Sequence, residues 1–177
     1  MKSAYLAKIS PIFETETEEE FLLLNGKKSF RIIAFFILAI WCFGFTFGSL
    51  FPHSKALILY PLIKEFYSTV CHQIAYKTIE MNGINFLVCA RCSGIYFGGL
   101  LSSIIFLFTT RNYKLDVKFI FLAAIPMAID VILYSSGVYD YSKIIALATG
   151  FLFGFITIGF ALISTENLFI KGNNKDK

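Results

Sequence analysis

Long apolar runs separated by short polar connections dominate this sequence. Four runs extend over 19 to 22 residues, and only the third contains a charged residue, Asp130. A helix rises about 1.5 Å per residue, so about 20 residues cross the hydrocarbon core of a bilayer. No run shows the period-two alternation of a barrel strand. We therefore expect an all-α membrane protein with four transmembrane helices, at about residues 32–51, 92–110, 119–139 and 144–165.

The connection between the first two runs, residues 52–91, contains a shorter apolar stretch. Residues 56–63 are too few to cross a bilayer, and Pro61 would break or kink a helix there. We expect an interfacial or re-entrant helix at about residues 54–70, with Ser54 as its N-cap. Its charged residues, Lys64 and Glu65, should face water.

Polar tails flank the transmembrane domain, which we place at residues 30–165. Residues 1–29 form a polar N-terminal tail and residues 166–177 a basic C-terminal tail. With four spans both tails lie on one side, which carries eleven Lys and Arg residues against five on the other. Since positive charge concentrates on the cytoplasmic side, we expect cytoplasmic termini and an extracytoplasmic connection 52–91.

Composition supports the membrane class. Hydrophobic residues make up 56% of the 177 residues, mean hydropathy is +0.68 and only 16% are charged, against about 25% in soluble domains. The net charge of +4 is spread over loops and helix ends rather than gathered in the patch that nucleic acid requires. The expected partner is therefore the lipid bilayer and not nucleic acid, and the sequence identifies no protein partner.

Cysteine and histidine residues gather near the predicted outer membrane surface. Cys71 and His72 lie in the connection, and Cys89 and Cys92 form a Cys-x-x-Cys pair where the second span begins. His53 is a further candidate ligand. The fourth cysteine, Cys42, falls in mid-span, where a packed small hydrophobe is expected.

Three hypotheses explain the cysteine cluster. Two cysteines separated by two residues can both face one metal ion, which favours three thiolates completed by His72, a carboxylate or water. A thiol pair at a helix N-terminus instead suits redox chemistry, because helix-end amides favour the thiolate. The third hypothesis is a structural disulfide that fastens the connection to the second span.

Small residues recur at helix-packing spacing in three spans. The Gly-x-x-x-Gly motif lets two membrane helices approach closely. All three motifs fall in the outer half of their spans, so we expect the first, second and fourth spans to crowd together beneath the cysteines. The motifs are Gly44 and Gly48, Gly94 and Gly98, and Gly150 and Gly154.

Asp130 requires a partner inside the bundle, because a charge near the bilayer centre costs at least about 2.5–3.5 kcal/mol. We expect an ion pair with Arg91, which precedes the second span and can reach inward. Thr149 and Tyr96 are the alternative hydrogen-bond donors. Pro126, four residues before Asp130, is expected to kink the third span.

The signature residues around the cysteines resemble a known family. The run Cys71-His72-Gln73, then Val88-Cys-Ala-Arg-Cys-Ser-Gly-Ile-Tyr96 and Gly98, closely resembles an uncharacterised prokaryotic family of integral membrane proteins, a domain of unknown function. Pro126, Asp130 and the run Thr149 to Gly154 are similar to its third and fourth spans. Polar residues common in that family are replaced here by Lys77-Thr78, Val131, Tyr134 and Ala146. The resemblance implies a prokaryotic cell membrane and a shared topology and site, and no activity.

The function hypotheses follow from these residues. The leading one is a metal-binding membrane protein that holds zinc or copper through Cys71, His72, Cys89 and Cys92, because soft thiolates select these ions. The first alternative is a thiol-disulfide oxidoreductase that uses Cys89 and Cys92, with Cys71 as exchange partner and a quinone as cofactor. The second is a small transporter or assembly partner that uses Asp130. The sequence favours a non-enzymatic role without excluding catalysis.

Overall fold

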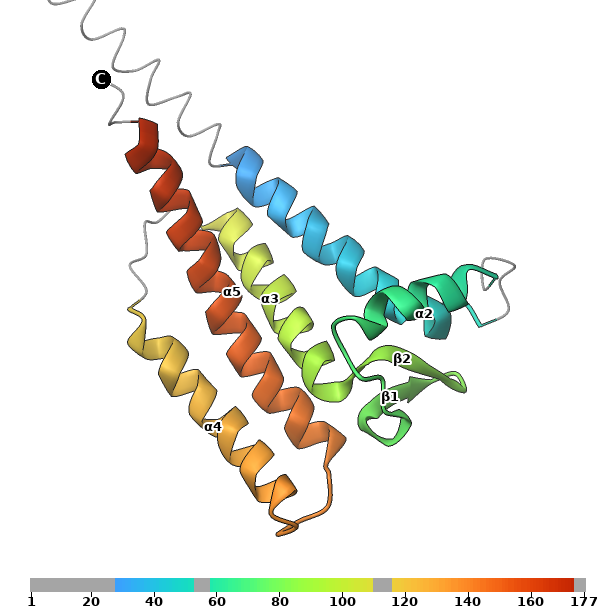
Figure 1. The fold of residues 1–177 in the computed structure, drawn as a ribbon. Coiled ribbons are helices and arrows are strands. Elements are labelled where there is room, and N and C mark those ends of the chain that lie inside the picture. Colours follow the sequence, from blue (N-terminus) through green and yellow to red (C-terminus); the bar gives the residue numbers. More distant parts are fainter. Residues whose placement is uncertain (1–27, 53–57, 110–115, 174–177) are drawn as a thin grey trace, which may run out of the picture.

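The computed structural model of the chain describes residues 28–52, 58–109 and 116–173, with side chains up to Glu166 in the last segment. Its first helix, Lys28–Leu50, is followed by the short helix α2 and by a small hairpin. Three long helices complete the described fold (Figure 1). The bounds are α2 Tyr60–Ser68, η2 Ala75–Lys77, β1 Thr78–Met81, β2 Ile84–Cys89, α3 Ala90–Phe108, α4 Lys118–Ser135 and α5 Lys143–Asn173.

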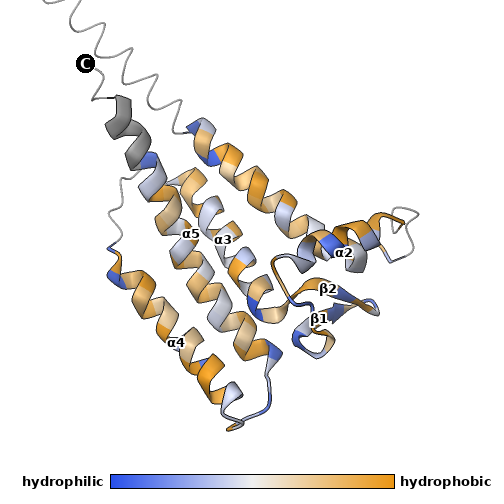
Figure 2. Cartoon of the chain, in the orientation of Figure 1, coloured by the Kyte–Doolittle hydropathy of each residue, from blue (hydrophilic) through white to orange (hydrophobic). Residues whose placement is uncertain are grey.

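Four helices are long and apolar enough to cross a membrane: Lys28–Leu50, α3, α4 and the part of α5 from Lys143 to Glu166. Only 11–33% of the residues in their most apolar windows are buried inside the protein. Large side chains such as Ile40 and Phe121 are about 70% exposed (69% and 70%), and Figure 2 shows apolar residues along the helix surfaces. Such a surface requires lipid as solvent, so the predicted all-α class with four transmembrane helices is confirmed.

The closest helix contact joins α3 and α5, and glycine makes it possible. A Cβ at Gly94 or Gly98 would overlap a backbone carbonyl of α5, while one at Gly150 or Gly154 would overlap a backbone carbonyl of α3. The two motifs therefore face each other, as close membrane helix packing requires. The expectation that the glycine motifs of three spans face one another is wrong for the first helix, because its two glycines face α2 instead.

Gly44 and Gly48 face α2 rather than α3. A Cβ at Gly44 would overlap the Tyr67 hydroxyl, and one at Gly48 would overlap the ring of Tyr60. The reason is that α2 lies across the end of the first helix (Figure 1), so the tyrosines of the connection reach these positions. Glycine spacing identifies a close approach but not the partner that makes it.

Two adjacent glycines of α3 offer a matched test of this packing. Gly98→Ala places a methyl against the fixed Phe151 carbonyl, whereas the nearest atom to a methyl in Gly99→Ala is Cδ1 at the end of the Ile158 side chain, which can move. Overpacking costs about 1–3 kcal/mol, so Gly98→Ala should lower the free energy of unfolding by this amount relative to Gly99→Ala. Denaturant unfolding in detergent micelles measures the difference. Equal stability of the two variants would contradict the close contact between α3 and α5.

The helix α2 matches the predicted interfacial helix but is shorter. It begins at Tyr60, with Pro61 in its first turn, where the missing amide hydrogen of proline costs nothing. Its nine residues are too few to span a bilayer. Lys64 and Glu65 are exposed as expected, beside exposed Leu62 and Phe66. Ser54, the expected N-cap, lies outside the described residues.

An antiparallel hairpin follows α2 and was not predicted. Strands β1 and β2 pair with Met81 opposite Ile84, and the turn between them is Asn82-Gly83, with φ angles of 54° and 76°. This dipeptide is the strongest short-range signal for a two-residue hairpin turn, so the sequence contained the information. Asn82 Nδ2 donates to the Ser49 carbonyl at 2.9 Å, which fastens the hairpin to the first helix.

A buried ion pair joins three helices at the end of the bundle far from the hairpin. Arg31 Nε and Nη2 donate to the two carboxylate oxygens of Glu166 at 3.0 and 2.9 Å. Arg31 Nη1 also donates to the Phe106 carbonyl at 3.0 Å and to the Thr109 carbonyl. Only 11% of the Arg31 side chain and 8% of the Glu166 side chain are exposed. This arginine therefore holds the first helix, the end of α3 and α5 together.

Candidate functional site

Three cysteines meet where the connection joins the helical bundle. The ligand atoms of Cys71, Cys89 and Cys92 all lie within 4.8 Å of one another. Cys71 is buried, with 8% of its surface exposed, and the other two are partly exposed. All four cysteines of the chain are free thiols in the structure. The spacing predicted this cluster, and the fold brings its three members together.

The backbone after α2 turns Cys71 towards the bundle. The helix ends at Ser68, and the Cys71 amide donates to the Tyr67 carbonyl at 3.1 Å. Gln73 then adopts a φ of 49°, in the left-handed region that glutamine seldom occupies. Its Nε2 donates back to the Lys64 carbonyl at 2.8 Å. The glutamine of the Cys-His-Gln run therefore reverses the chain and holds Cys71 in place.

Cys89 and Cys92 span the junction between a strand and a helix. Cys89 is the last residue of β2 and the N-cap of α3, and Cys92 lies in the first turn of α3. The Cys89 amide donates to the sulfur of Cys71 at 3.2 Å. Cys71 thus occupies the position at a helix N-terminus where negative charge is favoured.

These contacts favour a thiolate at Cys71. Hydrogen bonds from the Cys89 thiol and then from the Cys92 thiol hold the pKa of Cys71 well below its ordinary value. Burial acts in the opposite direction, and the backbone amides of Gln73 and Cys89 add to the lowering. A thiolate is the form of cysteine that binds metal and attacks disulfides.

Aromatic side chains surround the thiols on the side of the first helix. The ring of Trp41 packs edge-on against Tyr67 and Tyr96, with centroids 5.0 and 5.7 Å apart. The Tyr67 hydroxyl donates to the Trp41 carbonyl at 2.8 Å. Tyr96 also packs against Phe45, at 5.8 Å. The thiols therefore pack against a cluster of aromatic side chains.

Two histidines predicted near the site have different outcomes. His72 is exposed and lies outside the group of ligand atoms that Cys71 joins, because adjacent residues of the turn point apart. His53 lies outside the described residues. Cys42 is buried in the first helix, 5% exposed, and is not a member of the cluster. Its expected role as a packed hydrophobe agrees with this position.

The predicted ion pair beneath the cysteines is present. Arg91 Nη2 donates to Asp130 Oδ2, and the Asp130 residue is only 4% exposed. The second donor to Asp130 is Tyr139, whose hydroxyl binds the other carboxylate oxygen. Thr149, expected as a donor, instead binds the Ile145 carbonyl of its own helix at 2.9 Å. Sequence reasoning missed Tyr139 because it continued the third span to residue 139, whereas α4 ends at Ser135 and Gly137, with a φ of 69°, reverses the chain.

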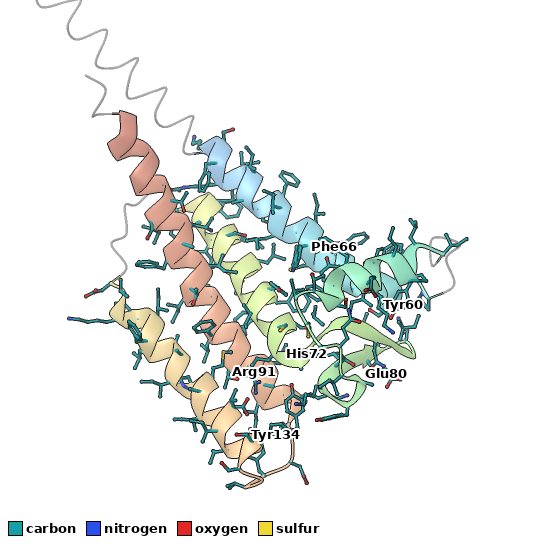
Figure 3. All side chains as sticks on the ribbon, in the orientation of Figure 1. Tyr60, Phe66, His72, Glu80, Arg91 and Tyr134 are labelled. Atoms are coloured by element: carbon teal, nitrogen blue, oxygen red, sulfur yellow. The ribbon has the colours of Figure 1, made fainter. Side chains whose placement is uncertain are left out.

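A tyrosine cage lies beside this pair and was also missed. The Lys77 ammonium lies 5.4, 4.6 and 5.6 Å from the ring centroids of Tyr76, Tyr134 and Tyr141. The hydroxyls of Tyr76 and Tyr134 are 2.9 Å apart, within hydrogen-bond distance. The fold places Lys77 of η2 against Tyr134 of α4. The cage links η2 to the loop before α5 and to α4, on which Figure 3 labels Tyr134.

Comparison with known proteins identifies a family match over the segments that form the site. Residues 71–160 match the family described as "Predicted membrane protein (DUF2085)", a stretch that begins at Cys71 and includes the other two clustered cysteines, Arg91 and Asp130. The chain belongs to this family. The family description supports a membrane protein and states no activity, and the expected resemblance is confirmed.

Two archaeal relatives support the same assignment. An uncharacterized protein of Methanocaldococcus jannaschii is 34% identical over 99 residues, which cover 54% of this chain and 64% of the relative. An uncharacterized protein of Methanothermobacter thermautotrophicus is 29% identical over 96 residues, covering 54% of this chain and 84% of the relative. This chain therefore spans less than two thirds of the first relative. No solved structure matches the chain.

Proposed function

We propose that this membrane protein binds a soft metal ion through Cys71, Cys89 and Cys92. The observation that supports the proposal is the convergence of three sulfur atoms within 4.8 Å. Zinc–sulfur bonds of about 2.3 Å at tetrahedral angles place sulfur atoms about 3.8 Å apart. Small side-chain rotations therefore suffice to enclose an ion.

Zinc and copper(I) fit the ligand set best, because thiolates bind these softer ions in preference to hard cations such as magnesium. Structural zinc sites use four protein ligands, whereas reactive sites keep one position for water or substrate. Within the described residues the group contains three cysteines and no fourth Cys, His, Asp or Glu. A ligand from solution, or His72 after rotation of the exposed turn, would complete the coordination.

The proposed site faces the extracytoplasmic side of a prokaryotic cell membrane. The cysteines lie at the end of the bundle that carries α2 and the hairpin, opposite the Arg31–Glu166 pair (Figure 1). Eleven Lys and Arg residues belong to the side that holds both termini, which the positive-inside rule assigns to the cytoplasm.

Metal analysis of the purified full-length chain tests this function. We expect one zinc or copper ion per chain, and less than a tenth of that content in Cys89→Ser, since a lost thiolate removes one of three protein ligands. Cys42→Ser is the matched control, because it removes a buried cysteine outside the cluster and should retain the ion. Wild-type protein without metal, or equal content in both variants, would overturn the proposal.

Thiol labelling in intact cells tests the sidedness of the same site. A membrane-impermeant maleimide should label Cys89 and Cys92 faster after chelation, because the metal protects the thiolates that react. Labelling only after the cells are permeabilised would place the site in the cytoplasm and contradict the orientation.

A thiol-disulfide oxidoreductase is the second candidate function. The thiolate of Cys71, held by hydrogen bonds from both other thiols, favours it. Oxidation of Cys89 and Cys92 to a disulfide releases two electrons and two protons, which a quinone would accept as it becomes a hydroquinone. Absence of metal together with a reducible Cys89–Cys92 bond would favour this function over metal binding.

A transport or assembly role centred on Asp130 has less support. Asp130 already has two partners, Arg91 and Tyr139, and an ion pair of this kind orients helices without any transported ion. Retention of every measurable function in Asp130→Asn would exclude this role.

A further inference from the structure

A cavity of about 370 Å³ lies between α2 and the hairpin, two elements that contact each other in the fold (Figure 1). Small-molecule sites in proteins enclose about 300–1,000 Å³, so this space can hold a small ligand. Its walls come from α2, from the turn that follows Cys71 and from the hairpin. None of the clustered cysteines is among the described residues that line it, so the cavity is separate from the proposed metal site.

Five polar side chains line this cavity: Tyr60, Lys64, Gln73, Thr78 and Asn85. Two of them already have partners in the protein. Gln73 Nε2 donates to the Lys64 carbonyl at 2.8 Å, and the Thr78 hydroxyl donates to a backbone carbonyl of its own turn at 2.8 Å. The Tyr60 hydroxyl, the Lys64 ammonium and the Asn85 amide have no hydrogen bond or ion pair with any described residue.

The three side chains without a partner come from two elements that face each other across the cavity. Tyr60 and Lys64 are four residues apart in α2, so they lie on the same face of this helix. Asn85 belongs to β2. Each of the three groups can donate a hydrogen bond, and the ammonium can only donate. The cavity therefore suits a ligand that accepts hydrogen bonds.

The charge of the lining favours an anion. Lys64 is the one charged residue among the described residues that line the cavity. The next residue, Glu65, lies on the other flank of α2, where it lines a separate groove with Phe66. Glu80 lies opposite Asn85 in the hairpin but does not line the cavity. The described lining thus carries one positive charge and no negative charge.

We propose that this cavity binds a small organic carboxylate with an apolar body. The carboxylate would accept hydrogen bonds from Lys64, Tyr60 and Asn85, and the apolar body would pack on Phe86 and Leu87, two buried residues that also line the cavity. One negative charge matches the single lysine, whereas a phosphate dianion would carry a second charge without a cation to pair it. The inference does not depend on metal binding, because no cysteine takes part.

Fluorine NMR of the purified full-length protein in lipid nanodiscs tests the inference, with fluorobenzoate as the probe. Its resonance should broaden saturably and by more than in empty nanodiscs, while neutral fluorobenzamide should behave as it does in empty nanodiscs. Lys64→Met removes the cation and should weaken binding about tenfold, as loss of a hydrogen bond to a charged group predicts. Tyr60→Phe keeps the ring against Gly48 and removes one neutral donor, so it should weaken binding by a smaller factor.

Lys143→Met is the matched control, because it removes an exposed lysine at the start of α5 that does not line the cavity. This variant has the same net charge as Lys64→Met and should bind the probe as wild type does. No broadening beyond that in empty nanodiscs, equal affinity in Lys64→Met, or an equal response to fluorobenzamide would each overturn the proposal. Displacement of the probe by inorganic phosphate as readily as by unlabelled benzoate would overturn the choice of a carboxylate.

Discussion

Asp130→Ala is expected to lower the free energy of unfolding by about 3–5 kcal/mol, the cost of removing one partner from a buried ion pair. The side chain of Asp130 is 3% exposed and that of Arg91 is 19% exposed, so the arginine would be left with little access to water. Tyr139 would lose its acceptor as well. Denaturant unfolding of the reconstituted protein measures the loss.

Two further variants separate charge from packing in this prediction. Asp140→Ala removes an exposed carboxylate from the loop that follows α4 and should change stability by less than about 0.5 kcal/mol. The double variant Arg91→Met with Asp130→Leu removes both charges and should recover most of the loss, because an apolar replacement of a buried pair is often neutral. Asp130→Ala as stable as Asp140→Ala would contradict a buried pair.

Arg31→Met should be nearly as damaging at the opposite end of the bundle, at about 3 kcal/mol for an ion pair that is almost fully buried. The change leaves the Glu166 carboxylate without its bidentate partner, and it also removes the donor to the Phe106 and Thr109 carbonyls. Because the cysteines lie at the other end, metal content should stay unchanged. Unfolding and metal analysis of the same sample report both quantities.

Lys28→Met provides the comparison for that arginine. Lys28 lies three residues before Arg31 in the first helix and is exposed. Its replacement should have little effect on stability. Combining Arg31→Met with Glu166→Leu should restore stability if the lost charge pairing is the cause. An Arg31→Met variant as stable as Lys28→Met would contradict the prediction that this ion pair stabilises the fold.

Three parts of the candidate site differ in how well the sequence predicted them. The cysteine cluster followed from spacing, since residues 89 and 92 enter one helical turn and one more thiol lay in the connection. The Arg91–Asp130 pair followed from the cost of an unpaired charge in a membrane. His72 was a less certain ligand, because a residue adjacent to Cys71 points away from it, and the structure leaves it exposed and outside the cluster.

The sequence by itself determined that this chain crosses a membrane as helices, because unpaired backbone groups cannot enter hydrocarbon and run length counts the spans. Only the tertiary structure decided which surfaces meet: Gly98 with α5, Gly44 with Tyr67, and Tyr139 with Asp130. These partners are distant in sequence or separated by turns. The contacts between these partners depend on where the backbone reverses and on the angles at which the helices cross. The hydropathy pattern of the sequence determines neither.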